Sequence, residues 1–154
     1  MKTVAVLALA ISCAAVARAQ TPTMVLHPAA EMQWKDGPES LPKGAQMMVL
    51  EGNPSLPGPF TLRFKFPKGF QIQPHFHTQT EHATVLSGTI LLGMGEHFDR
   101  AAMRPLVAGS FGYWPAGTPH FAWTESETVL QLHGQGPWTI QYVNPADDPR
   151  GVRP

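Results

Sequence analysis

The chain has 154 residues, a length typical of one domain, with 11 basic residues, 11 acidic residues, seven histidines and one cysteine. The formal charge is zero at pH 7 and no basic run interrupts the sequence. This balance argues against nucleic acid and anionic membrane surfaces as partners.

Residues 1–19 have the three parts of a secretory signal peptide. Met1-Lys2 gives a positive start, Val4 to Val16 is apolar, and Ala17-Arg18-Ala19 forms a small-x-small cleavage site. The apolar stretch is shorter than the roughly 20 residues that span a bilayer. An uncleaved anchor, or lipid attachment at Cys13, fits this pattern less well. We therefore expect a signal peptide over 1–19 and one exported domain over 20–154, in the periplasm or outside the cell.

Cleavage would remove Lys2, Arg18 and Cys13. The mature domain then has two fewer basic residues, 9 against 11 acidic, for a net charge of −2, and it has no cysteine. Disulfides, thiolate catalysis and cysteine zinc sites are therefore excluded from it.

Sixteen prolines and fourteen glycines divide the domain into short segments, and no stretch keeps a helical period for three turns. This pattern predicts an all-β fold. The clearest strand is Phe60–Phe66, in which apolar residues alternate with Thr61, Arg63 and Lys65. Further strands are predicted at 45–50, 70–77, 82–86, 89–94, 111–114, 120–123, 128–133 and 138–143. Ser87-Gly88 predicts a hairpin turn, and 96–105 has room for one helical turn.

Three histidines and one glutamate form a candidate metal site. His75 and His77 are two residues apart on a predicted strand, so their side chains leave the same face. Glu81 follows four residues later, and His120 begins a distant strand. Imidazole and carboxylate ligands together suit a divalent transition metal: Mn, Fe, Ni, Cu, Co or Zn. The ligand set leaves the identity of the metal open.

The spacing of these residues resembles the cupin superfamily. Gly69-x5-His75-x-His77-x3-Glu81-x6-Gly88 resembles the first cupin motif, within 69–88, and Gly109-x5-Pro115-x-Gly117-x2-His120 resembles the second, within 109–124. The resemblance implies a small jelly-roll barrel (a double-stranded β-helix) of about eight to ten strands, with one metal on the four residues named above. It also implies a homodimer. The segments 34–38 and 142–149 are similar to those of exported bacterial cupins of unsettled activity.

Several other residues are candidates for the pocket or for support of the ligands. Gln71 and Gln73 share the parity of His75 and His77, and they would point into the barrel if no bulge intervenes. Thr124 stands where the second motif usually ends in Asn. His133 could serve as a base behind the ligands, although packing is the simpler interpretation.

Parity also predicts which side chains face away from the site. His82 follows Glu81 directly and should therefore face outward. Phe121 and Trp123 have the opposite parity to His120 and should face outward as well. Two outward aromatic side chains need a cover. Either the segment around Met32 to Trp34 packs over them or a second subunit does, and the resemblance favours the second subunit.

Two classes of function remain open. The first is a metal-dependent enzyme acting on a small organic molecule, with dioxygenase, decarboxylase, isomerase and lyase chemistry all found on this fold. The second is a non-catalytic module that binds a small ligand or a metal. We favour the enzyme, because four convergent ligands exceed what a structural role requires.

Overall fold

The computed structural model describes residues 23–151, so the predicted signal peptide lies outside the described residues. This part of the chain contains eleven strands and three short 3-10 helices. The strands are β1 (Lys35–Asp36), β2 (Gln46–Glu51), β3 (Gly58–Phe66), β4 (Gln71–His77), β5 (Glu81–Ser87), β6 (Thr89–Met94), β7 (Arg104–Val107), β8 (Phe111–Trp114), β9 (His120–Thr124), β10 (Thr128–Gly136) and β11 (Ile140–Tyr142). The helices are η1 (Ala29–Glu31), η2 (Arg100–Ala102) and η3 (Pro145–Asp147).

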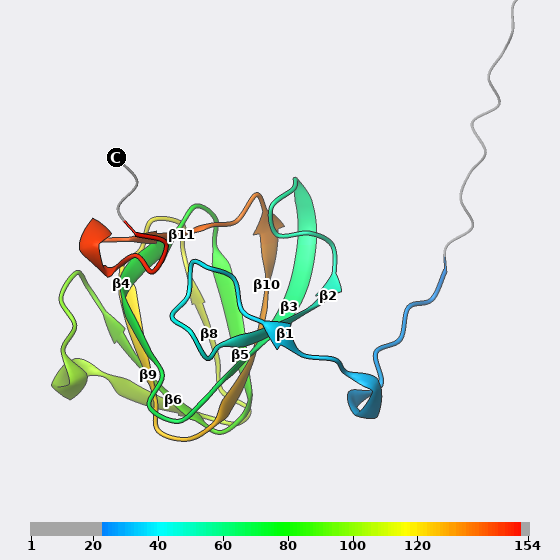
Figure 1. Ribbon diagram of the computed structural model, residues 1–154, viewed down its shortest axis with the longest axis horizontal. Coiled ribbons are helices and arrows are strands. Elements are labelled where there is room, and N and C mark those ends of the chain that lie inside the picture. Colours follow the sequence, from blue (N-terminus) through cyan, green and yellow to red (C-terminus); the bar gives the residue numbers. More distant parts are fainter. Residues whose placement is uncertain (1–22, 152–154) are drawn as a thin grey trace, which may run out of the picture.

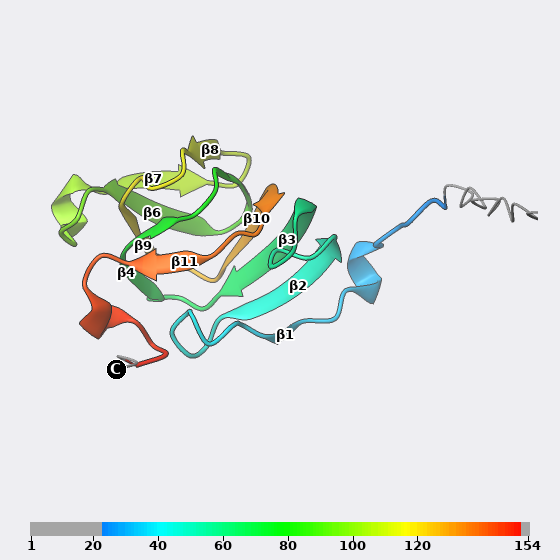
Figure 2. The same ribbon diagram turned by 90° about the horizontal axis from the view of Figure 1, so that it is seen from above.

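The strands form two antiparallel sheets that pack face to face as a jelly roll (Figure 1). One sheet has six strands in the order β1-β2-β3-β10-β5-β8, and the other has five in the order β11-β4-β9-β6-β7. Figure 2 shows the two layers from above, with β7 and β8 side by side at one margin. The predicted all-β class and jelly-roll architecture are therefore confirmed. No helix among residues 23–151 is long and apolar enough to cross a membrane.

The alternation predicted for Phe60–Phe66 is the pattern of β3. Its apolar residues are buried, while Thr61, Arg63 and Lys65 lie on the outer face. The inward residues of β3 meet those of β10 in register, as at Phe64 opposite Leu130. Buried residues of the five-stranded sheet, such as Ile72, Ile90 and Ala122, belong to the same core, which is thus built from the inner faces of both sheets.

All nine predicted strands are present, but the predicted hairpin at Ser87-Gly88 is wrong. β5 and β6 belong to different sheets, so Gly88 turns the chain across the barrel rather than back along one sheet. It adopts a φ of 78°, and a Cβ there would collide with the carbonyl oxygen of Glu127. Glycine is therefore required at this corner.

Strand β4 contains a bulge that sets the geometry of the site. Ile72 lies opposite Ala122 of β9, and His75 lies opposite His120. Between these two pairs, β4 advances by three residues while β9 advances by two. The extra residue reverses the parity of the strand between these positions. Ile72 and His75 therefore both face the interior.

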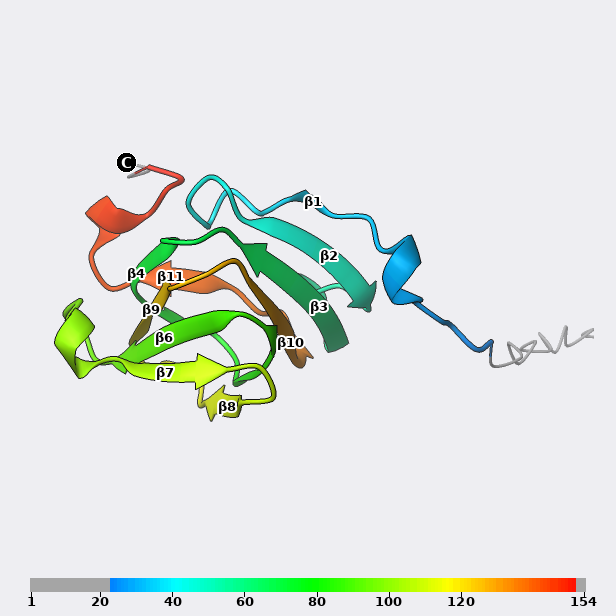
Figure 3. The same ribbon diagram turned by 90° about the horizontal axis from the view of Figure 1, so that it is seen from below.

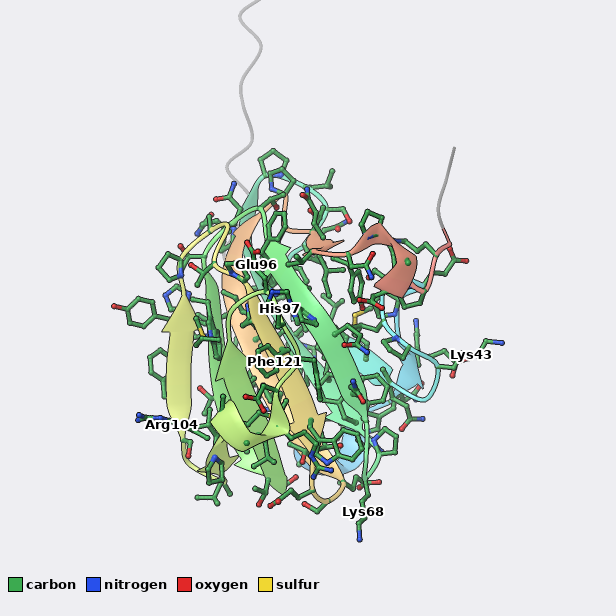
Figure 4. All side chains as sticks on the ribbon, turned by 90° about the vertical axis from the view of Figure 1, so that its left-hand side faces the viewer. Lys43, Lys68, Glu96, His97, Arg104 and Phe121 are labelled. Atoms are coloured by element: carbon green, nitrogen blue, oxygen red, sulfur yellow. The ribbon has the colours of Figure 1, made fainter. Side chains whose placement is uncertain are left out.

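The outward residues of β9 are covered within the same chain. The Phe121 ring lies 5.2 Å from that of Phe98, and the Arg100 guanidinium lies 4.3 Å above the Trp123 ring. Figure 4 looks onto this face, with Phe121 near its middle and Glu96 and His97 of the covering connection over the same region. Gly93 on the neighbouring strand is needed here, because a Cβ would collide with the Phe121 ring.

The segment Met32 to Trp34 lies elsewhere, on the outer face of the six-stranded sheet. Met32 contacts the Arg63 guanidinium, and Trp34 lies under the Lys65 ammonium at 4.7 Å. Figure 3 shows the chain between η1 and β1 on the side of β2, away from β9. Phe121 and Trp123 therefore need no second subunit as a cover, and the homodimer stays a prediction.

Candidate metal centre

Three histidines converge inside the barrel. His75 and His77 come from β4, and His120 comes from β9 directly opposite His75. All three side chains are buried, and one ring nitrogen from each lies within 4.8 Å of the others. A metal ion needs ligand atoms at this kind of separation, so the cluster is suited to a divalent metal.

Each of these imidazoles is held by a backbone carbonyl at Nδ1. His75 Nδ1 lies 2.7 Å from the carbonyl oxygen of Gln73, His77 Nδ1 lies 3.1 Å from that of Thr139, and His120 Nδ1 lies 3.0 Å from that of Thr118. A carbonyl oxygen can only accept, so each Nδ1 carries the proton and donates. In the neutral rings, every Nε2 therefore presents a lone pair, which is the form that coordinates a metal.

Burial favours these neutral rings. Desolvation holds the pKa of His75 well below its ordinary value of 6.5, and the neighbouring His120 and His77 lower that pKa further. Desolvation also lowers the pKa of His120, although the Glu81 carboxylate opposes the shift. At neutral pH, His75 and His120 thus hold lone pairs rather than protons at Nε2.

Glu81 enters the same interior from β5 of the opposite sheet. Its Oε2 contacts His77 Nε2 and lies 3.9 Å from His120 Nε2. Burial raises the pKa of Glu81, but His77 and then His120 outweigh that effect, and the net shift is downward. The side chain is therefore a carboxylate at neutral pH.

The contact between His77 and Glu81 is a test of whether these residues fit a metal. Both His77 Nε2 and Glu81 Oε2 are buried and have no hydrogen-bond partner. In the neutral ring both atoms are acceptors, so they repel unless a cation lies between them. A proton on Nε2 or a metal ion satisfies both atoms at once. The three-histidine cluster and the adjacent carboxylate therefore fit a divalent metal.

Two indoles flank the cluster. Trp138 stacks on His77 with ring centroids 4.4 Å apart, and Trp114 stacks on His120 at 5.2 Å. The interplanar angles are 18° and 19°. Each indole fixes the plane of one imidazole, while a backbone carbonyl fixes its tautomer.

The cluster faces a cavity of about 60 Å³ enclosed between the sheets. This space exceeds the roughly 10–15 Å³ that one buried water needs, so the cavity can hold a small molecule. Apart from the four candidate ligands and Ser40, its lining is apolar. The apolar lining residues are Pro38, Leu41, Phe64, Phe66, Ile72, Ile90, Leu92, Trp114, Ala122, Leu130, Leu132, Trp138 and Ile140.

Tyr142 ties the segment 38–41 to the barrel. Its hydroxyl donates to the carbonyl oxygen of Ser40 at 2.9 Å, and its ring lies 6.0 Å from His75. Burial, with the nearby Asp148, raises the pKa of Tyr142 far above its ordinary value. The hydroxyl therefore remains a donor and holds this part of the cavity wall in place.

The structure places the other candidate residues away from the cavity. Gln71 lies opposite Trp123 on the outer side of β4, and Gln73 meets the site only through its carbonyl oxygen, because the bulge in β4 reverses the parity. Thr124 faces inward, but its hydroxyl donates to the carbonyl oxygen of Pro67 at 2.6 Å and accepts from the Phe70 N–H at 2.8 Å. It closes the bottom of the barrel instead of lining the pocket.

His133 lies on the outer face of the six-stranded sheet, so a role behind the metal ligands is wrong. It stacks on His82, with ring centroids 4.9 Å apart, directly across β10 and β5. His82 also lies near the Tyr113 ring at 5.9 Å. The outward placement predicted for His82 is confirmed.

Sequence reasoning did not assign Trp114, Trp138 or Ser40 to the cavity. Trp114 has the parity of an inward residue opposite Glu81, a signal that pairing with β5 would have revealed. Trp138 precedes β11, and Ser40 lies in the connection between β1 and β2. Trp138 shares the parity of the buried Ile140 and Tyr142 in the predicted strand 138–143, which is a signal for the interior. Ser40 has no such signal, so only the folded chain brings it to the cluster.

Comparison with known proteins agrees with this geometry. The sequence profile of the ChrR cupin-like domain matches residues 22–139. No protein with a curated description matches the sequence significantly. Similar solved structures include the polyketide cyclase RemF from Streptomyces resistomycificus, with 17% identity and a TM-score of 0.67 over 83% of this chain and 91% of that one. KdgF from Halomonas sp. has 21% identity and a TM-score of 0.56 over 74% of this chain and 96% of that one.

An oxalate oxidase shares 25% identity, with a TM-score of 0.52 over 73% of this chain and 61% of that one. These likenesses lie in the barrel, and the profile covers more than half of the chain. The protein therefore belongs to the family of ChrR cupin-like domains, within the cupin superfamily.

Proposed function

We propose that the protein is a divalent-metal-dependent enzyme that acts on a small organic molecule inside the barrel. The observation that carries this proposal is the convergence of three buried imidazoles, each with its proton fixed on Nδ1, beside a carboxylate whose Oε2 has no hydrogen-bond donor. A purely structural cluster would gain nothing from leaving these acceptors without partners.

The residues of the site would have different roles. His75, His77, Glu81 and His120 would hold the metal, which when bound would polarise a carbonyl or enolate or bind dioxygen. Backbone carbonyls of Gln73, Thr139 and Thr118 keep the three imidazole protons away from the cavity. The apolar wall excludes bulk water, which strengthens electrostatic interactions with a bound substrate.

Structures with a similar fold support the proposal of an enzyme that acts on a small molecule. The names of RemF, a polyketide cyclase, and of the oxalate oxidase describe enzymes that act on small organic molecules. The barrel of this chain is similar to theirs and carries its cluster inside. The cavity volume of about 60 Å³ restricts the substrate to a small one.

One observation favours the alternative, a non-catalytic module that holds a metal or a small ligand. Outside the four candidate ligands, the cavity lining contains no titratable side chain. An enzyme that moves protons would have to use Glu81 or the substrate itself for that step. A binding module has no such need.

The deciding experiment begins with protein exported and purified without chelators. Its metal content should be about one divalent ion per chain by elemental analysis. The loaded protein is then incubated with a panel of small carboxylates and diketones, and oxygen uptake and product formation are followed. Turnover that disappears in His120→Ala supports the enzyme. A loaded protein that binds members of the panel by calorimetry but converts none supports the binding module, and exported protein without metal contradicts both.

A further inference from the structure

We propose that the cavity selects a small organic monoanion with an apolar body, bound to the metal through its single charged group. This inference rests on the proposed function, because it assumes that a divalent metal occupies the candidate site. It goes further by naming the charge and size of the molecule that the chain admits.

The charge follows from the ligands. The three histidines must be neutral and Glu81 must be ionised to coordinate a metal. Two positive charges on the metal and one negative charge on Glu81 then leave one uncompensated positive charge in a buried cavity. A ligand carrying one negative charge cancels it, and a neutral ligand leaves it uncompensated.

A second negative charge on the ligand would find no cationic side chain and would leave the site with a net charge of about −1. No lysine or arginine lines the cavity, and much of the lining consists of aliphatic side chains such as Ile90, Leu92 and Leu132. An unpaired ionised carboxylate buried against such a wall is strongly disfavoured. The lining therefore discriminates against dianions.

Two neutral donors remain for an uncharged polar atom of the ligand. Ser40 lines the cavity, and its position is fixed through the hydrogen bond from Tyr142 to its carbonyl oxygen. Trp138, also in the lining, has a buried indole N–H without a hydrogen-bond partner. Either donor can serve a keto or hydroxyl oxygen, but neither supplies a positive charge.

The size follows from the cavity. The space of about 60 Å³ beside the cluster suits a small organic acid. Propionate, malonate and propionamide are therefore suitable probes, since they are close in size and carry one, two and no negative charges at about pH 8.

The experiment measures binding rather than turnover. Protein loaded with Co²⁺, and verified to contain it by elemental analysis, is titrated with each probe at matched ionic strength. Calorimetry and the visible absorption of the bound Co²⁺ report the affinity. Propionate should bind at least about tenfold more tightly than malonate and propionamide. Malonate or propionamide binding as tightly as propionate would overturn the inference.

Two substitutions in β6 test whether the missing cation in the wall sets the preference. Leu92→Lys places a cation in the cavity wall and should shift the preference toward malonate. Leu91→Lys is the matched control, because Leu91 lies opposite Trp123 on the outer face of the same strand and should leave the preference unchanged. An unchanged preference in a folded, Co²⁺-loaded Leu92→Lys protein would also contradict the inference. If Leu92→Lys fails to fold, the comparison of the three probes on the wild-type protein still decides.

The two proposals fail in different ways. Wild-type protein that takes up no Co²⁺ contradicts the metal site and, with it, the proposed function. Protein that takes up Co²⁺ but binds malonate more tightly than propionate contradicts only the monoanion.

Discussion

Trp138 and Thr139 together fix the plane and the tautomer of His77. The Trp138 ring stacks on the His77 ring with 4.4 Å between centroids, and the carbonyl oxygen of Thr139 accepts from His77 Nδ1 at 3.1 Å. Two consecutive residues before β11 thus orient a candidate ligand that belongs to β4. Such supporting contacts commonly set the metal affinity of a site as much as the ligands do.

Trp138→Ala should therefore weaken metal binding by about 10- to 100-fold, because the His77 ring loses the surface that holds its plane. Trp138→Phe keeps a stacked ring and should stay close to the wild type. Competition with a chromophoric chelator measures both affinities. Equal losses in the two variants would show that the stacked ring is not what matters.

His75→Ala and His120→Ala should each lower metal affinity at least about tenfold, since either change leaves an incomplete set of ligands. His82→Ala is the control, because this imidazole stacks on His133 outside the barrel. Elemental analysis after dialysis against a weak chelator gives the metal content. Comparable metal loss in all three variants would contradict the placement of His82.

Alternation and motif spacing predicted much of this structure, because both are local. The alternation of β3 needs only one exposed and one buried face, and the spacing from His75 to Glu81 spans only two strands that are consecutive in the chain. The strand β7 was missed because Pro105 argues against a strand. An edge position tolerates the missing N–H, and β7 is the edge of its sheet.

Gln71 and Gln73 would face inward only in a strand without a bulge; β4 has one, and it is not visible in the sequence. Counting by twos from His77 and His75 puts both glutamines inside, whereas pairing with β9 puts Ile72 inside instead. The prediction of which segment covers Phe121 was wrong for a related reason. Whether Phe98 or Met32 lies over β9 depends on how the connections fold back, and no local pattern encodes that.

Acid should destabilise the metal-free protein in a defined pH range. Burial holds the pKa of His75 well below 6.5, and unfolding returns it to about that value, so the unfolded chain binds more protons in between. The stabilisation is complete above about pH 6.5 and is lost as the pH falls toward the folded pKa. Denaturant titrations between pH 7.5 and 5 should show this fall in the free energy of unfolding.

His75→Asn should make that pH dependence shallower. His97→Asn, at an exposed position after β6, should keep the wild-type slope. The same slope in His75→Asn and in the wild type would assign the acid sensitivity to other groups.

Export should leave a mature chain that begins at Gln20. The motivation is the arrangement of a positive start, an apolar stretch and Ala17-Arg18-Ala19 before this residue. Intact-mass measurement of protein from the periplasm or the medium should give the mass of residues 20–154, or that mass less ammonia if Gln20 cyclises. Exported protein that retains Met1 would show that no signal peptide is removed.

Thr124→Val should destabilise the fold while leaving metal affinity unchanged. The Thr124 hydroxyl donates to the carbonyl oxygen of Pro67 and accepts from the Phe70 N–H, so one buried side chain joins β9 to the turn before β4. Valine has nearly the same shape but leaves both backbone groups with fewer partners, at a cost of about 1–3 kcal/mol for each group left unsatisfied. Thr89→Val on β6 is the control, because Thr89 bonds Ser126 and Thr128 through its backbone atoms, outside this junction. Denaturant unfolding and chelator competition on the same samples separate the two effects. A loss of metal affinity with unchanged stability would instead indicate that Thr124 supports the metal centre.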